Sequence, residues 1–152
     1  KGHLGQTLYL REIEGREDGT PPPVDLKGEK ATGEFLKEQI NKGNITSCHD
    51  ISDGGLLIAI VEMALASNLG VSTCGFDRDM PSHAWFFGED QGRYLICSGD
   101  SNLFVREAGL KSVPIKKVGV VGGHEIIVDG ESIALKELRD AHESWLPNLM
   151  AN

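Results

Sequence analysis

A polar turn holds the densest set of chemically useful side chains in this sequence. It runs from His49 to Gly55, reads His-Asp-Ile-Ser-Asp-Gly-Gly, and lies between a β-like run and a long apolar run. Asp50 and Asp53 carry the hard oxygen ligands that magnesium prefers, and His49 can donate or accept a proton near neutral pH. The residue types therefore indicate a site for a cation, a phosphate or both.

The two glycines of this turn add a second kind of chemistry. Gly54 and Gly55 let the backbone approach a ligand closely, and the following helix start presents free N–H groups with positive dipole character. The candidate phosphate- or substrate-binding residues of the turn are therefore His49, Ser52, Asp53, Gly54 and Gly55, and Asp50 is a candidate magnesium ligand. A structural alternative stays open, in which Ser52 or Asp53 caps the helix and the glycines only form the turn.

A second polar cluster, Gly-Glu-Asp-Gln-Gly-Arg, precedes a later β-like run. Glu89 and Asp90 could hold a cation, Gln91 could read a polar substrate through its amide, and Arg93 could pair with a phosphate or a carboxylate. We take Glu89 as a second candidate magnesium ligand beside Asp50, and Gln91 and Arg93 as further candidate phosphate- or substrate-binding residues. The alternative is a solvated polar turn with an internal ion pair.

Strands that alternate with helices must position these clusters. Expected strands are Ile45–Ile51, Val71–Phe76, Gly92–Ser98, Ile115–Val121 and Glu125–Val128, the last two joined as a hairpin through Gly122 and Gly123, with a further tight turn at Asp129-Gly130. Expected helices are Gln6–Glu14, one capped by Asp25 and ending at Gly43, Leu56–Ala66, Pro81–Phe87, Asn102–Ala108 stopped by Gly109, and one from Leu135 broken near Pro147.

This order predicts an α/β (α+β) fold in which a mixed β-sheet is layered with helices. The Leu56–Ala66 helix has apolar groups around most of its surface, so it is expected at the centre of the fold. Because α/β folds place ligands at strand ends, the two polar clusters converge if their strands are neighbours. Asp50 and Glu89 are then expected on the same edge of the sheet.

Composition narrows the class of protein. A chain of 152 residues with 39% apolar and 25% charged residues has the size and make-up of one ordinary globular domain. A formal net charge of −8 argues against binding to nucleic acid or an anionic membrane surface.

Three cysteines without CxxC spacing, Cys48, Cys74 and Cys97, are expected to be reduced and buried, which favours a cytoplasmic location. Trp85 and Trp145 are expected in the core.

The ends of the sequence suggest a piece of a longer polypeptide. The chain begins at Lys1 without an initiator methionine, and no charged and then apolar export segment follows. The longest apolar stretch falls far short of the roughly 20 residues that a membrane span needs.

Several of these segments together resemble one known family. They are Cys48–Leu56, Phe87–Glu89 with Gln91–Tyr94, Leu4–Gln6 with Tyr9–Glu12, and Leu135–Leu146. Their pattern is similar to the C-terminal domain of phosphoribosylformylglycinamidine synthase subunit II, in the aminoimidazole ribonucleotide synthetase-like superfamily. The resemblance covers nearly the whole chain, so it implies a single C-type domain over residues 1–152 that is a fragment of a multidomain synthase.

The resemblance implies a function in purine biosynthesis. Such a ligase uses ATP and magnesium to convert formylglycinamide ribonucleotide (FGAR) and ammonia, taken from glutamine, into formylglycinamidine ribonucleotide. Its implied partners are the remaining domains of the same polypeptide, a glutaminase subunit and a small accessory subunit. The ATP-binding N-type domains and the family's catalytic histidine are missing from this chain, so no catalytic residue is expected in it and the isolated chain is expected to be inactive.

The resemblance also carries over to individual positions. Enzymes of this family contain two copies of an N-type and a C-type domain arranged as a pseudo-dimer, and this chain resembles the second C-type copy. Asp50 matches a magnesium-binding Asp in the family's first C-type copy, and Glu89-Asp90-Gln91 matches a substrate-contacting Glu-Ser-Gln run. Ser52 and Asp53 depart from the Gly and Ala of that copy. Three alternatives therefore stay open: a domain that supplies ligands to a composite site, a structural domain that completes a pseudo-dimer, and the equivalent domain of another enzyme of the superfamily.

Overall fold

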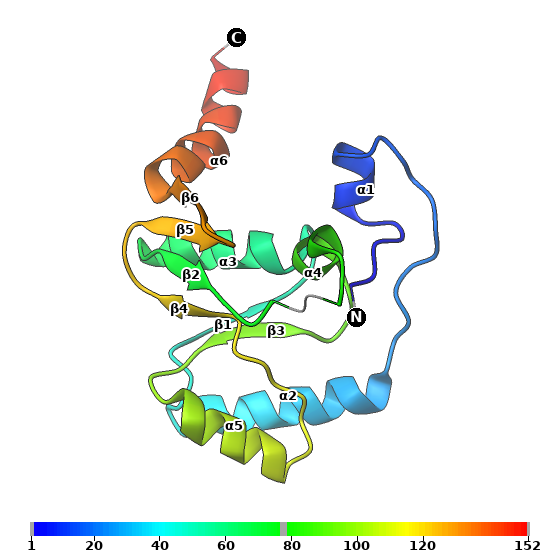
Figure 1. The fold of residues 1–152 in the computed structure, drawn as a ribbon, viewed down its shortest axis with the longest axis vertical. Coiled ribbons are helices and arrows are strands. Elements are labelled where there is room, and N and C mark those ends of the chain that lie inside the picture. The colour runs from blue at the N-terminus through cyan, green and yellow to red at the C-terminus, as the bar shows by residue number, and fades with distance from the viewer. Residues whose placement is uncertain (1, 77–78, 152) are drawn as a thin grey trace. The chain divides into compact units, whose positions relative to one another are not determined.

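The computed structural model describes residues 2–76 and 79–151. Its helices are α1 (Leu8–Glu12), α2 (Leu26–Asn41), α3 (Gly55–Ser67), α4 (Ser82–Phe87), α5 (Ser101–Leu110) and α6 (Leu135–Met150). Its strands are β1 (Ser47–Asp50), β2 (Val71–Thr73), β3 (Tyr94–Cys97), β4 (Gly119–Val121), β5 (Glu125–Val128) and β6 (Glu131–Ala134). Figure 1 labels these helices and strands along the chain. The described residues divide into two compact units, unit 1 with residues 2–59 and 79–117 and unit 2 with residues 60–76 and 118–151.

Unit 1 combines a two-stranded antiparallel sheet, β1 with β3, and the helices α2 and α5. The α2 helix starts where the sequence predicts, because the side chain of Asp25 accepts a hydrogen bond from the Gly28 nitrogen at 3.0 Å. Asp100 caps α5 in the same way. Gly109 does not stop α5, since that helix continues to Leu110.

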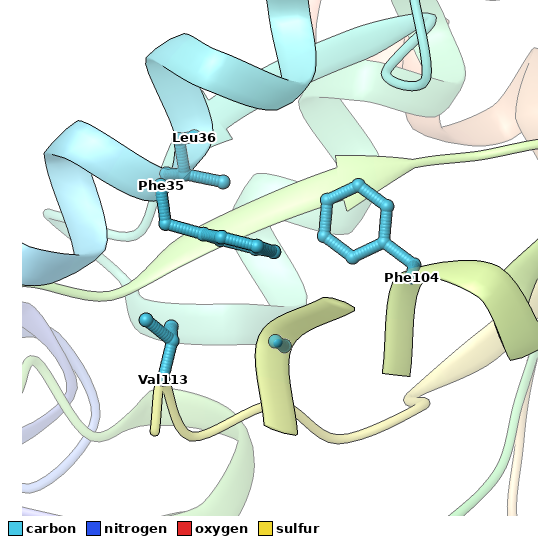
Figure 2. Close-up of a cluster of buried hydrophobic side chains, with 5 residues drawn as sticks. Phe35, Leu36, Phe104 and Val113 are labelled. Atoms are coloured by element: carbon cyan, nitrogen blue, oxygen red, sulfur yellow. The ribbon is translucent and has the colours of Figure 1, made fainter. Parts of the chain in front are cut away.

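The apolar cluster of unit 1 lies between α2, α5 and the segment after α5 (Figure 2). The rings of Phe35 and Phe104 meet edge to face with centroids 5.4 Å apart. Leu36, Ala108 and Val113 complete the cluster, and Ile96 of β3 packs against it. One side of the β1–β3 sheet is thereby anchored on a packed core.

Unit 2 contains a four-stranded mixed sheet in the order β4-β2-β5-β6. The expected hairpin of β4 and β5 is wrong, because β2 lies between these strands, antiparallel to β4 and parallel to β5. The Gly122-Gly123 segment pairs with Gly70 through two backbone hydrogen bonds of 2.8 and 2.9 Å and so wraps around the start of β2. The hairpin is instead β5 with β6, a strand that sequence reasoning missed, joined by the expected Asp129-Gly130 turn with both φ angles positive.

The long apolar helix α3 is buried on one side only. Leu56, Ala59, Ile60, Ala64 and Leu65 are buried, whereas Ile58 is 37% exposed and Val61 is half-buried. The sequence predicts that this helix lies at the centre of the fold, and the structure buries only part of it. Its burial is incomplete, because Glu62 and Ala66 share an exposed face with Ile58.

Three further expectations are corrected. The last helix, α6, is not broken at Pro147: it runs to Met150, and the Ala151 nitrogen still donates to the Pro147 carbonyl at 3.0 Å. Trp145 lies on this helix and is 67% exposed rather than in the core. Cys48 and Cys74 are exposed and Cys97 is half-buried, because β1 leaves most of its side chains open to solvent and Cys74 lies beyond the end of β2. Within residues 2–76 and 79–151, no helix has the length and apolar character of a membrane span.

Candidate functional site

The two polar clusters of the sequence meet at one end of the β1–β3 sheet in unit 1. Asp50, the last residue of β1, pairs with Tyr94, the first residue of β3. The next nitrogen, that of Ile51, donates to the Arg93 carbonyl at 2.9 Å. Antiparallel pairing therefore brings the turn after β1 beside the loop before β3, and Asp50 and Glu89 lie at the same sheet end.

The glycines of the turn are required by its backbone. Gly54 and Gly55 have φ angles of 77° and 71°, in the left-handed region that favours glycine. A Cβ on Gly55 would lie 2.7 Å from the carbonyl carbon of Phe87 and 2.8 Å from the Gly88 oxygen. The turn thus packs directly, backbone on backbone, against the loop that begins at Gly88.

The Glu89 carboxylate joins this turn to the N-terminal segment. Its Oε1 atom accepts hydrogen bonds from the Gly54 nitrogen at 2.8 Å and from the Leu8 nitrogen at 2.9 Å. Both are N–H groups at helix starts, where no partner exists within the helix. The Gly54 N–H, which the sequence predicts to be part of a phosphate cradle, therefore already donates its hydrogen bond to the Glu89 carboxylate.

Asp90 fastens the beginning of the described chain to the same loop. It is 5% exposed, and its Oδ2 accepts hydrogen bonds from the nitrogens of Gly2 at 2.8 Å and His3 at 3.4 Å. Burial alone raises the pKa of Asp90, but the bond from Gly2 and the charge of Arg93, 3.7 Å away, outweigh burial and hold this pKa below its usual value. Asp90 is a charged anchor rather than an open cation ligand.

Arg93 points back into its own loop. Its Nη2 donates to the Gly88 carbonyl, and burial lowers the pKa of its guanidinium, partly offset by Asp90. Arg93 and Asp90 therefore form the internal ion pair that the sequence analysis gave as an alternative, with 3.7 Å between Nη2 and Oδ2. Gln91 is exposed.

The remaining candidate residues face solvent or the backbone. The His49 Nδ1 donates to the Asp50 carbonyl at 2.5 Å and lies 3.7 Å from the Asp50 carboxylate, whose side chain is 69% exposed. Ser52 and Asp53 are exposed, and the Ser52 carbonyl accepts a 3.0 Å bond from the Gly55 nitrogen. Of the carboxylates at this sheet end, Asp50 and Asp53 are the ones most open to solvent.

These residues do not form a magnesium site around Oε1 of Glu89. Within the described part of the chain, no three His, Cys, Asp or Glu residues are grouped closely enough to hold a metal ion. Magnesium takes carboxylate oxygens, water and substrate phosphates in octahedral geometry, and Oε1 of Glu89 already accepts two N–H groups. Asp50 remains the more accessible carboxylate for such an ion.

Comparison with known proteins assigns the fold. The sequence matches the family described as AIR synthase related protein, C-terminal domain, over residues 1–129. The chain belongs to this family. The family resemblance and the mixed α/β fold expected from the sequence are thereby confirmed.

Relatives of this AIR synthase related domain are synthase subunits. Phosphoribosylformylglycinamidine synthase subunit PurL of Zymomonas mobilis is 48% identical over 150 residues, which cover 99% of this chain and 20% of that protein. The PurL subunit of Rhodopseudomonas palustris strain TIE-1 is 50% identical over 153 residues, covering 99% of this chain and 21% of its own length. The chain spans about a fifth of the curated relatives it matches.

Solved structures share the fold of this AIR synthase related domain. Phosphoribosylformylglycinamidine synthase II from Thermotoga maritima superposes with a TM-score of 0.66 at 19% identity, over 90% of this chain and 24% of that one. T. maritima PurL complexed with FGAR gives a TM-score of 0.64 at 20% identity, over 76% of this chain and 21% of that one.

Sequence reasoning missed the N-terminal segment of this family member as part of the site. Gly2, His3 and Leu8 enter it through backbone groups, which no side-chain pattern reveals. The ring of Tyr9, in the same segment, stacks on the rings of His83 and Phe87 of α4, with centroids 5.6 and 5.1 Å away.

Proposed function

We propose that residues 1–152 form one C-type domain of a longer phosphoribosylformylglycinamidine synthase subunit. Residues 1, 77, 78 and 152 of this range lie outside the part of the chain that the structure describes. The longer enzyme is a ligase of purine biosynthesis that converts FGAR, ammonia from glutamine and ATP into formylglycinamidine ribonucleotide. The observation that carries this proposal is the 48–50% identity to PurL subunits over 99% of the chain. The alternative of another superfamily enzyme is not favoured, because both relatives carry the synthase name.

ATP and magnesium are the cofactors of the proposed enzyme. The ATP assignment is supported by T. maritima PurL structures described as complexes with ATP and with AMPPCP. When bound, magnesium neutralises phosphate charge. On this chain, Asp50 is the carboxylate we propose for such an ion, and His49, Ser52, Asp53 and Gln91 are the residues we propose for a phosphate or substrate. Ser52, Asp53 and Gln91 are exposed, and His49 is half-buried.

The proposed partners are other parts of the synthase. They are the remaining domains of the same polypeptide, a glutaminase subunit and a small accessory subunit, in the cytoplasm. The T. maritima structure described as PurLQS supports partner subunits for the relative. A formal net charge of −8 is consistent with a partner set that includes no nucleic acid.

The isolated chain is proposed to have no synthase activity. Catalysis requires a complete constellation of positioned groups, and the resemblance assigns the ATP-binding domains and the catalytic histidine to other parts of the polypeptide. A purely structural domain remains the second candidate. It is favoured by one observation, the bonds that engage Glu89 with the Gly54 and Leu8 amides.

A chimera tests the proposal. The matching 150-residue region of the Zymomonas mobilis subunit is replaced by this chain, and the gene is expressed in a purine-requiring host that lacks its own synthase. We expect growth without added purine, while a version with the region deleted fails to support growth. Failure of a chimera that is expressed and folded contradicts the proposed function.

A further inference from the structure

We infer that Glu89 is a positioning residue that holds the His49–Gly55 turn through its backbone, and that it is not a magnesium ligand. The kinetic part of this inference rests on the proposed function, whereas the structural part concerns the chain alone.

The geometry of one oxygen atom carries the inference. Oε1 of Glu89 accepts from Leu8, 81 positions earlier, and from Gly54, 35 positions earlier. Leu8 is the first residue of α1, and Gly54 directly precedes α3. One carboxylate therefore satisfies two orphan donors that belong to segments far apart in the sequence.

The surroundings of Glu89 hold its backbone in place. The Glu89 nitrogen donates to the His3 carbonyl at 3.0 Å, and the adjacent Asp90 accepts from Gly2 and His3. Gly55 lies against the backbone of Phe87 and Gly88 just before Glu89. The carboxylate is thus aimed at the turn by a backbone that is fixed on both sides.

A positioning role and a ligand role predict opposite effects of one substitution. Glu89→Gln removes the charge but keeps an oxygen that can accept from both nitrogens. Glu89→Ala removes the acceptor and leaves two N–H groups without their partner. Magnesium binding depends on the carboxylate charge, so a ligand role makes Glu89→Gln as damaging as Glu89→Ala.

The first measurement is amide hydrogen exchange on the 152-residue chain. We expect exchange at Gly54 and Leu8 to speed up about tenfold or more in Glu89→Ala and to stay within about threefold of wild type in Glu89→Gln. Glu34→Ala and Glu34→Gln, on the exposed face of α2, are matched controls that leave these two amides unchanged. Exchange at both amides that is as slow in Glu89→Ala as in wild type overturns the inference.

The second measurement is the magnesium concentration that gives half-maximal synthase activity in the longer enzyme. We expect Glu89→Gln to leave it within about twofold of wild type, because the charge is not used to hold the ion. A rise of about tenfold overturns the inference, and this arm decides the matter if Glu89→Ala fails to fold. A wild-type enzyme without synthase activity refutes the proposed function instead, and the contrast in amide exchange between Glu89→Ala and Glu89→Gln still tests the positioning role.

Discussion

The Oδ2 atom of Asp90 lies 2.8 Å from the backbone nitrogen of Gly2, 88 positions earlier in the chain. Together with the bonds of Glu89, this contact makes the loop before β3 the attachment point for the N-terminal segment of unit 1. The loop therefore links three things: the sheet end, the glycine turn and residues 2–8.

The Asp90 contact predicts a pH-dependent stability. Because the folded-state pKa of Asp90 is depressed, its stabilisation is fully present above the unfolded value of 3.8 and is lost as the pH falls through the lower folded value. We expect Asp90→Asn to lower the free energy of unfolding by about 1–3 kcal/mol at pH 7. Urea unfolding across pH 7 to 3 checks this: the difference from wild type should shrink below about pH 4, and a difference independent of pH contradicts it.

The glycine turn predicts a steric penalty at Gly55. Gly55→Ala puts a methyl group against the backbone of Phe87 and Gly88, whereas Gly43→Ala has the same left-handed φ but nothing within 4 Å. We expect Gly43→Ala to cost about 1 kcal/mol from backbone conformation alone and Gly55→Ala to cost clearly more. Chemical denaturation of both variants tests this, and equal losses are the result that contradicts the close approach.

The end of α3 predicts a role for Arg139 in unit 2. Its Nη2 donates to the Leu65 carbonyl at 2.7 Å, in the last turn of α3, where carbonyls lack helical partners. Arg139→Ala should lower the free energy of unfolding by about 1–2 kcal/mol. Lys136→Ala is the matched control, because both cations form an i,i+4 ion pair on α6 and only Arg139 reaches α3. Similar losses in thermal melts of the two variants argue against the cap.

Two adjacent positions of α3 test how the helix is buried. Ile60 is 2% exposed, while Val61 is half-buried. From the sequence alone, Val61→Asp is predicted to unfold the chain; the structure shifts this prediction to Ile60→Asp, where an unpaired charge would be fully buried. Circular dichroism should show an unfolded Ile60→Asp and a folded, less stable Val61→Asp, and the reverse order means that the helix is rotated.

Helix caps and tight turns were the parts of the fold that could be predicted from the sequence. The Asp25 cap of α2 and the Asp129-Gly130 turn follow from a few neighbouring residues, and the structure contains both. The false β4–β5 hairpin shows the limit, because Gly122 and Gly123 bond to Gly70, about 50 residues earlier. Strand order in a mixed sheet depends on such distant pairings, which a turn signal does not encode.

The candidate site shows the same limit. Sequence reasoning found the two clusters and their common sheet end, because strand ends and polar turns are local patterns. It assigned Glu89 by its carboxylate chemistry, yet the partners of that carboxylate are backbone nitrogens of Gly54 and Leu8. Every residue carries such a donor except proline, so no residue type identifies it.

Synthase turnover by the longer enzyme tests the central claim most directly. ADP formation that depends on FGAR and ammonia is measured for the complete subunit, for the subunit without this domain, and for the isolated 152-residue chain. We predict turnover by the complete subunit only, because the catalytic groups must be assembled from several domains. Undiminished turnover by the subunit without this domain, or turnover by the isolated chain, contradicts the account.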